Sequence, residues 1–371
     1  MGIYIGTLLL IFVLGVLDLM LKLSDLQRKY LMFLLYVVLV VQIGLRWETG
    51  TDWNPYLDNF ETSDNYGVVL LNSLVGFEIG YGTAVFIVKK IFNNYSVFLF
   101  LHAVIFYWGI FRTAKKYSPY FFISLMFFYA TTLGVVGSNR QLLAIIICLW
   151  GLDFIFEKKV FKFFITIAVA SLFHTTALIF GVYYFLNRNF KTVTVFSILI
   201  LSFIIGKTGL PLLLFSKFGG LIGEVASSKA TFYSENNSSS GENLGLSVFG
   251  LVKRIVFVMI FAYNYAFLNK KLIYYKLLYN GYVFGLVIYF LFASSLLILI
   301  NRGSLYFNIM ESLLISCQFL VFYKRLDKSY IYFILLLISI IFLFQSISAY
   351  SDLFDPYKGV FYNVDFVREM Y

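Results

Sequence analysis

Runs of about 20 apolar residues, separated by short polar segments, are the feature of this sequence that most constrains its fold. A helix of that length crosses the hydrocarbon core of a bilayer with every backbone group hydrogen-bonded internally. Of the 371 residues, 61% are hydrophobic and 13% are charged, which is about half the charge of a soluble domain. We therefore exclude a soluble enzyme, a disordered chain and a disulfide scaffold, and predict an all-α integral membrane protein.

The apolar runs predict about twelve transmembrane helices. A stretch between Lys162 and Asn187 is interrupted by His174, so it forms either one long helix or two short ones that meet there. We adopt two short helices, because basic residues then face inward in short loops, where the positive-inside rule is strongest. The other predicted helices are residues 3–21, 30–45, 95–111, 119–136, 141–157, 193–207, 246–268, 279–300, 305–323 and 329–348.

Lysine and arginine in the short loops predict the orientation, because these residues collect on the cytoplasmic side. Basic residues follow the first, third and fifth helices, beginning at Lys22, Arg112 and Lys158. This pattern places both termini outside and predicts residues 79–92 as an amphipathic helix along the outer interface. The net charge of +10 is then explained by inner loops rather than by a nucleic-acid partner.

The chain shows no internal repeat and no boundary between domains, so we predict a single polytopic membrane domain over residues 1–371. Residues 46–94 and 208–245 are predicted external loops, and residues 349–371 a polar external tail. Neither zinc-ligand spacing nor a basic run points to a metal, a cofactor or nucleic acid, and we predict none of these.

Polar residues beside the apolar runs indicate function, because charge at membrane depth is costly. Residues 46–56 begin at a helix end and combine the Arg46 guanidinium, a glycine and the Asp52 carboxylate with aromatic rings that could stack on sugars. An ordinary interfacial anchor explains the same residues, with Arg46 snorkelling and Trp47 and Trp53 in the aromatic belt. Both interpretations stay open here.

Two arginines are squeezed between apolar runs. Arg140, followed by Gln141, is predicted at a helix start, where free N–H groups and the helix dipole favour an anion, and guanidinium matches phosphate oxygens bidentately. Arg302 repeats this arrangement, although a turn with a snorkelling arginine explains either site. Lys253 and Arg254 lie one turn into an apolar run, so they mark its true start or face a polar cavity.

The sequence contains 2 histidines. His174 is a candidate base or a donor to a phosphate or glycan hydroxyl, and a buried, hydrogen-bonded histidine is an equally good interpretation. His102, in the middle of an apolar run, is predicted to be structural, and Glu311 is predicted to pair with a basic residue. Arginines, carboxylates and a histidine near one membrane face suit an anionic, lipid-linked substrate.

Five short motifs occur in a fixed order between residues 46 and 307. They are Arg46-x3-Gly50-x-Asp52-x3-Tyr56, Glu78-x-Gly80-Tyr81, Ser138-x-Arg140-Gln141-x2-Ala144, Phe173-His174-x2-Ala177-Leu178-Ile179 and Arg302-x3-Tyr306-Phe307. In residue types, order and spacing they resemble the EpsG-like family of bacterial polysaccharide polymerases, related in role to the Wzy-type O-antigen and capsule polymerases. Ile79 departs from the pattern, because the family commonly has proline after the glutamate.

The resemblance implies a GT-C-like, metal-independent glycosyltransferase of the bacterial inner (cytoplasmic) membrane, with its active site on the periplasmic or external face. Such an enzyme polymerises undecaprenyl-diphosphate-linked repeat units into O-antigen, capsule or exopolysaccharide. Its partners would be the lipid-linked donor and acceptor glycans, the bilayer, a chain-length regulator and a flippase.

The resemblance also implies roles for individual residues. Arg140 and Arg302, with Arg46, would stabilise the leaving diphosphate, since positive charge must lie where negative charge develops. Asp52 is the first choice of general base, followed by Glu78 and His174. The remaining predicted substrate-binding residues are Tyr56, Tyr81, Gln141, Lys253, Arg254 and Tyr306.

Two other functions fit the composition. A lipid-linked oligosaccharide flippase or transporter would have a similar cationic cavity, but internal repeats and matching broken helices are expected of it and are not seen. A membrane acyltransferase would depend on His174, yet no acidic residue lies within four positions of that histidine. The family resemblance therefore favours the polymerase.

Overall fold

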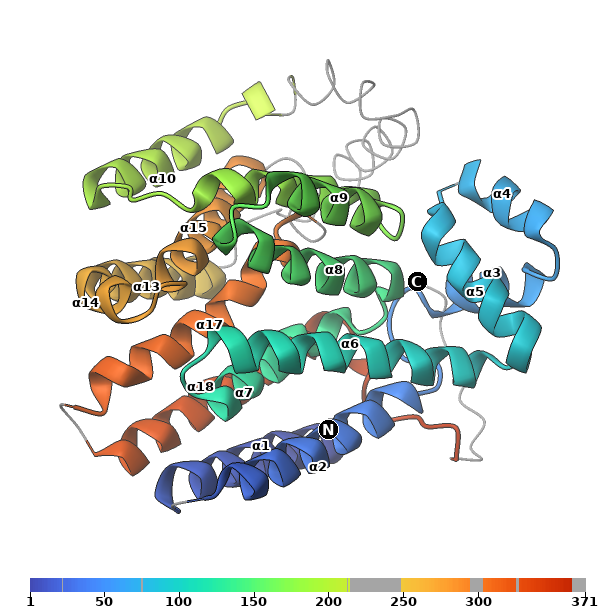
Figure 1. Ribbon diagram of the computed structural model, residues 1–371, viewed down its shortest axis with the longest axis horizontal. Helices are drawn as coiled ribbons and strands as arrows, with labels where there is room; N and C mark the ends of the chain where they lie inside the picture. The colour runs from blue at the N-terminus through green and yellow to red at the C-terminus, as the bar shows by residue number, and fades with distance from the viewer. Residues whose placement is uncertain are drawn as a thin grey trace. The chain divides into compact units, whose positions relative to one another are not determined.

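The computed structural model describes residues 1–21, 23–74, 76–211, 213, 248–293, 303–324 and 327–361 (Figure 1). These residues form helices, and the only ladder pairing among them is an isolated bridge between Arg46 and Gly359. The chain divides into two compact units, one of residues 1–175 and 315–371 and the other of residues 176–314. The prediction of a single domain stays a prediction, and each unit is described by itself.

The first unit holds most of the helices. Within it, α8 packs on α6 and α9, α2 packs on α6, and α7 packs on α1 and α18. Its elements are α1 (Gly2–Met20), α2 (Asp25–Gly44), α3 (Trp53–Thr62), α4 (Tyr66–Leu74), α5 (Ile79–Phe92), α6 (Tyr95–Tyr117), α7 (Phe121–Thr132), η1 (Leu133–Val135), α8 (Asn139–Phe156), α9 (Val160–Ser171), α18 (Lys328–Ile347) and η4 (Ser348–Leu353).

In the second unit, α15 packs on α10, α13 and α14. The division between the units falls within α17, after Leu314. The elements of this unit are η2 (Thr175–Leu186), α10 (Thr192–Gly206), α13 (Val248–Tyr263), α14 (Tyr265–Lys271), α15 (Tyr275–Phe292) and the first part of α17 (Leu305–Phe322).

Seven of the described helices are long and apolar enough to cross a membrane, or up to eight if the bent pair α13 and α14 is one span. The predicted multi-pass, all-helical class is therefore confirmed. Every one of the twelve predicted runs contains a helix, but α9, η2, α10 and α7 with η1 are shorter apolar helices. Twelve crossings and the GT-C-like fold stay predictions.

The predicted break at His174 is confirmed. Helix α9 ends at Ser171, and the 3₁₀ helix η2 begins at Thr175. Residues 172–174 lie between the two helices, and the backbone N–H of His174 still donates to the Ala170 carbonyl at 3.1 Å. The histidine thus lies at a helix end rather than inside a continuous span.

The predicted external loop of residues 46–94 is largely helical, because it contains α3, α4 and α5. Both α3 and α4 pack on α5, and these helices lie together in blue to cyan in Figure 1. The sequence did not predict α3 and α4, because helices of 10 and 9 residues are too short to show a clear helical repeat of apolar residues. The predicted helix over 79–92 is present as α5, and its place at the interface stays a prediction. Most of the predicted loop 208–245 lies outside the described residues.

The end of the described chain is attached to the loop after α2. Arg46 and Gly359 form the isolated bridge, with the N–H of Trp47 donating to the Lys358 carbonyl at 3.0 Å and the N–H of Val360 donating to the Leu45 carbonyl at 2.9 Å. Residues 358–360, in the described part of the predicted polar tail, therefore hold residues 45–47 in place.

The helix α5 ends and α6 begins at a turn of two asparagines. Asn93 adopts the left-handed conformation with φ 42°, which asparagine tolerates better than most residues and which ends α5. Asn94 then caps α6 by accepting a hydrogen bond from the N–H of Val97 at 3.2 Å. The sequence Asn-Asn thus sets a sharp reversal between two packed helices.

Two motif glycines allow close backbone contact. Gly50 has φ +98°, and a Cβ built on it would lie 2.5 Å from the Cα of Gly137. Gly80 approaches the end of α9, where its N–H donates to the Leu172 carbonyl at 2.8 Å and a Cβ would lie 2.7 Å from that oxygen. These contacts join the loop after α2 to the start of α8, and the start of α5 to the end of α9.

We predict that Gly50→Ala lowers stability by about 1–3 kcal/mol, because the added Cβ requires both a strained φ and a displacement of the Gly137 backbone. Thermal unfolding of the purified protein in detergent measures the effect. Gly6→Ala is the matched control, since nothing lies within 4 Å of its Cβ position in α1. Equal unfolding temperatures for the two variants would contradict the close contact.

Candidate active site

A partly buried ion pair joins the start of α8 to the start of α5. The Arg140 Nη1 atom lies 2.7 Å from Glu78 Oε2, and the side chains are 13% and 12% exposed. Arg140 is the second residue of α8 and Glu78 directly precedes α5. In this structure Arg140 therefore pairs with a carboxylate of the protein, and its predicted contact with a substrate phosphate stays a prediction.

Arg140 makes its other contacts with the segment just before Glu78 and with α3. Its Nη1 also donates to the Gly76 carbonyl, and its Nε donates to the Tyr56 hydroxyl at 3.3 Å. The guanidinium carbon lies 4.7 Å from the centre of the Phe77 ring, within the range of a cation–π contact. The guanidinium is thus held between an aromatic face and a carboxylate.

Glu78 binds a second segment through its other oxygen. Its Oε1 accepts hydrogen bonds from the Thr175 backbone N–H at 3.0 Å and from the Thr175 hydroxyl at 3.4 Å. His174, the preceding residue, is 5% exposed. One carboxylate therefore brings the start of α8 and the break at His174 to the start of α5.

Ile79 is the first residue of α5. Proline is favoured at the first position of a helix, since its missing N–H would lack an intrahelical partner there anyway. Isoleucine therefore keeps the same helix start, and the departure from the family pattern leaves Glu78 in place.

Arg46 lies inside the protein, 1% exposed. Its Nη1 donates to the Ile43 carbonyl at 2.7 Å, and its Nη2 donates to Asn139 Oδ1 at 2.7 Å and to the Val136 carbonyl at 3.3 Å. These bonds connect the end of α2 to the start of α8. As placed, Arg46 positions the segment that carries Arg140, and its predicted contact with substrate stays a prediction.

His102 is structural in its contacts, as predicted. It is 3% exposed on α6, and its Nε2 lies 2.9 Å from the Asn139 carbonyl oxygen. Asn139 therefore binds both Arg46 and His102, and it is a positioning residue that the sequence prediction missed. Its signal was available, since Asn139 directly precedes Arg140 in the polar stretch between two apolar runs.

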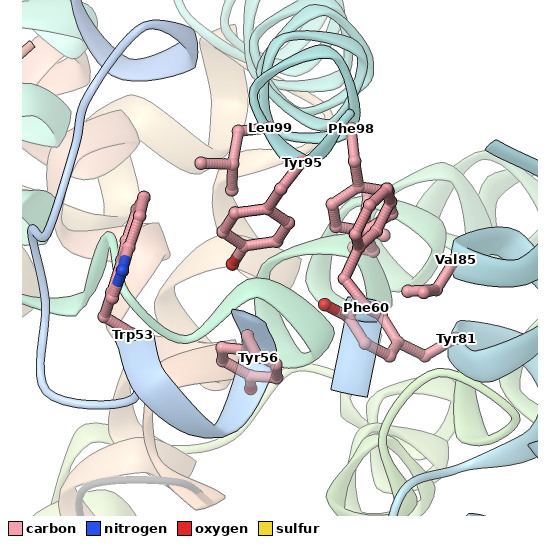
Figure 2. Close-up of a cluster of buried hydrophobic side chains, with 9 residues drawn as sticks. Trp53, Tyr56, Phe60, Tyr81, Val85, Tyr95, Phe98 and Leu99 are labelled. Carbon is pink, nitrogen blue, oxygen red and sulfur yellow. The ribbon is translucent and has the colours of Figure 1, made fainter. Parts of the chain in front are cut away.

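An aromatic cluster, drawn in Figure 2, contacts Arg140 through its member Tyr56. Tyr56 and Tyr81 are 2% and 0% exposed, with ring centres 5.5 Å apart. Burial raises the pKa of Tyr81 well above its usual value, so its hydroxyl stays neutral. The cluster consists of Trp53, Tyr56, Phe60, Tyr81, Val85, Tyr95, Phe98, Leu99 and Leu143.

Two predicted residues lie beside this region with less defined contacts. Asp52 is partly buried, directly precedes α3 and accepts a hydrogen bond from the Thr51 hydroxyl at 3.3 Å. Gln141 follows Arg140 in α8 and is 1% exposed. Their predicted roles stay predictions.

The second unit carries its own charged residues. Lys253 Nζ pairs with Glu311 Oε1 at 2.8 Å, which confirms the predicted basic partner of Glu311. The Arg254 guanidinium carbon lies 3.8 Å from the centre of the Tyr289 ring, and the Tyr306 hydroxyl accepts from the Thr176 hydroxyl at 3.2 Å. Because α13 begins at Val248, the two basic residues lie inside the helix rather than at its start.

Arg302 lies outside the described residues, so its predicted approach to the other arginines is untested. Among the residues that the structure describes, no group of three His, Cys, Asp or Glu side chains is arranged to hold a metal ion. Of the predicted site residues, the structure brings together Tyr56, Glu78, Arg140 and the segment at His174. Phe77 and Thr175 also contact this group, and the sequence prediction missed both.

Apolar helices of membrane-spanning length, together with a partly buried ion pair at helix ends, define a multi-pass membrane protein with a polar site. The family model of the EpsG family matches residues 29–359, so the chain belongs to the EpsG family. Searches of curated proteins and of solved structures found no match. Family membership and the apolar helices favour a membrane polysaccharide polymerase.

We predict that Glu78→Gln and Arg140→Gln each destabilise the protein by about 2 kcal/mol, because each leaves a partly buried charge without its partner. The double variant should lose less than the sum, with a coupling of about 1 kcal/mol or more. Denaturant titration of the purified protein in detergent measures the three losses.

The matched control is Arg28→Gln, whose exposed pair with Asp18 should change stability by less than about 1 kcal/mol. Strict additivity of the two buried substitutions would show that Glu78 and Arg140 do not interact in the folded protein.

Proposed function

We propose that this protein polymerises lipid-diphosphate-linked oligosaccharide repeat units at the external face of the bacterial cytoplasmic membrane. The observation that carries this proposal is the Glu78–Arg140 pair, which puts an anion-binding guanidinium and a carboxylate 2.7 Å apart at the meeting point of helix ends. Membership of the EpsG family supplies the chemistry, since its members are expected to build polysaccharide.

In the proposed reaction, a hydroxyl oxygen of the acceptor glycan attacks the anomeric carbon of the donor glycan. The bond from that carbon to the carrier diphosphate breaks, and the undecaprenyl diphosphate leaves with the electron pair. The hydroxyl proton passes to a carboxylate. One glycosidic bond forms for each bond to diphosphate that breaks, so the growing chain is transferred to the new unit.

Arg140 is the proposed diphosphate ligand. A guanidinium presents paired donors that match phosphate oxygens, and in a site of low dielectric its charge acts strongly on the leaving group. It supplies the positive charge that a divalent cation supplies in other transferases, so we expect polymerisation by the reconstituted protein to persist in EDTA. Arg254, Lys253 and Arg302 are proposed to bind the same class of substrate.

Glu78 is the proposed general base, ahead of Asp52 and His174. Its carboxylate is paired with Arg140 in the empty protein, and a diphosphate that takes over the guanidinium would release it for the acceptor hydroxyl. Binding of the donor would therefore prepare the base. Tyr56, Tyr81 and Gln141 are proposed to shape the substrate site, and Arg46 to hold the start of α8. In the second unit, Tyr306 is proposed to bind the same class of substrate as Lys253 and Arg254.

We predict that Arg140→Lys loses long-chain polysaccharide, with turnover reduced about 100-fold, because lysine keeps the charge but not the paired donors. Glycan length on gels from cells that carry the variant measures the effect. Arg28→Lys is the control, since Arg28 is 44% exposed and pairs with Asp18. Normal chains from a stable Arg140→Lys protein would remove Arg140 from the reaction.

Two conservative variants distinguish the candidate bases. Glu78→Gln should stop polymerisation in a protein that still elutes as a folded species, and Asp52→Asn should leave long chains. The reverse pattern would restore Asp52 as the base, as first predicted from the sequence. Loss of activity in both would indicate that the two carboxylates act together.

A deletion strain separates the polymerase from a flippase. A missing polymerase should leave single repeat units exported and attached to their acceptor, because flipping and ligation still proceed. A strain that exports no repeat unit at all would instead identify the chain as a flippase.

A further inference from the structure

A pocket lies beside the aromatic cluster, and the cluster members Phe60 and Tyr95 form part of its wall. Its volume is about 360 Å³, within the range of about 300–1,000 Å³ that small-molecule sites occupy. Its walls include Trp47, Glu61, Lys89, Asn93, Asn94 and Tyr95. The pocket thus combines an aromatic side chain with amide, carboxylate and ammonium groups.

We propose that this pocket, called the Trp47 pocket below, binds one or two uncharged sugar residues of the glycan chain. The proposal rests on the polymerase function, because it assigns the place where that enzyme holds the glycan away from the diphosphate. The chemistry is that of polyol recognition, in which a ring face covers the apolar side of a sugar and polar groups bind its hydroxyls.

Trp47 is the aromatic platform. It is 36% exposed, although its ring packs edge-on against Trp53 at 5.2 Å between centres. The Trp47 backbone is also fixed, since its N–H donates to the Lys358 carbonyl at 3.0 Å. A tryptophan that is held rigidly and yet exposed loses little conformational entropy when a ligand stacks on it.

Lys89 is an unusual wall residue, because its side chain is only 9% exposed. Its ammonium lies 2.9 Å from Asp64 Oδ1 and also donates to the Glu61 carbonyl. Asp64, outside the pocket wall, pairs with the Lys89 ammonium, and Glu61 adds a negative charge to the wall, so the pocket does not favour an anion. We therefore assign it to a neutral sugar, with diphosphate bound elsewhere.

The two asparagines supply the amide groups. They occupy the turn between α5 and α6, and the side chain of Asn94 already accepts from the N–H of Val97. Asn93 is exposed, and its amide carries both donors and an acceptor, which is what a sugar hydroxyl requires of its partner. The same turn that reverses the chain thus places an amide at the rim of the pocket.

The aromatic cluster connects the pocket to the ion pair. Tyr95 and Phe60 line the pocket and belong to the cluster, and Tyr56 of the same cluster accepts a hydrogen bond from Arg140. Rings follow one another from Trp47 through Trp53 to Tyr95, with centres 5.2 and 5.3 Å apart. Both sites therefore lie against one continuous aromatic wall within the first unit.

Two substitutions test the pocket without disturbing the fold. Trp47→Ala removes the exposed platform, and Asn93→Gly removes the amide while glycine accepts the left-handed φ of 42°. Trp108→Ala is the matched control, since Trp108 is 53% exposed on α6 and does not line this pocket. The probe is the neutral oligosaccharide released by mild acid from the host cell's own surface polysaccharide.

Binding of this probe to the full-length protein in detergent is measured by calorimetry. Trp47→Ala and Asn93→Gly should each weaken binding about tenfold, the factor that corresponds to about 1.4 kcal/mol, and Trp108→Ala should bind like the parent. Arg140→Lys should also bind like the parent, because it acts on the diphosphate. In cells, Trp47→Ala should shorten the glycan chains.

The failures of the two proposals are distinguishable. Unchanged binding in Trp47→Ala and Asn93→Gly, or no binding by the parent protein, would overturn the glycan pocket even if Arg140→Lys abolishes polymer. Weakened binding in those variants, combined with normal polymer from Arg140→Lys and Glu78→Gln, would keep the pocket and overturn the proposed chemistry.

Discussion

The Glu78–Arg140 ion pair is the contact on which the arrangement of the candidate site depends. Glu78 directly precedes α5 and Arg140 is the second residue of α8. Glu78 also binds Thr175, directly after the break at His174. Three segments far apart in sequence are thus brought together by one carboxylate and one guanidinium. A pair so poorly exposed to water is strong enough to hold them, since breaking a buried pair costs several kcal/mol.

The backbone makes this pair possible by close approaches that only glycine allows. Gly50 contacts Gly137, three residues before Arg140, and Gly80 contacts Leu172, two residues before His174. Side-chain hydrogen bonds then hold the start of α8 in place. The Asn139 side chain accepts from Arg46, and the Asn139 backbone carbonyl contacts His102. The short motifs read from the sequence are therefore positioning elements as much as chemical ones.

Much of this could be predicted from the sequence, and the exceptions have physical reasons. Apolar runs identified the helices, because lipid demands their length. The isolated charge between two apolar runs identified Arg140, whereas the family resemblance identified Glu78. Which carboxylate pairs with Arg140 was not predictable, since no local sequence pattern favours Glu78 over Asp52. The helices α3 and α4 were missed because they are short and amphipathic, and the attachment of Lys358 and Gly359 to residues 46–47 depends on backbone bonds that no side-chain pattern records.

Deleting one partner of a buried ion pair costs several kcal/mol, yet replacing that partner by another ion of the same charge can cost little. Buried pairs contribute little net stability, because the cost of desolvating both charges roughly offsets their attraction. In the proposed reaction, a diphosphate would replace Glu78 as the anionic partner of the Arg140 guanidinium. The Glu78 carboxylate would then lie free near the incoming glycan. On the proposed function, the carboxylate holds the arginine in position until a substrate anion competes for it.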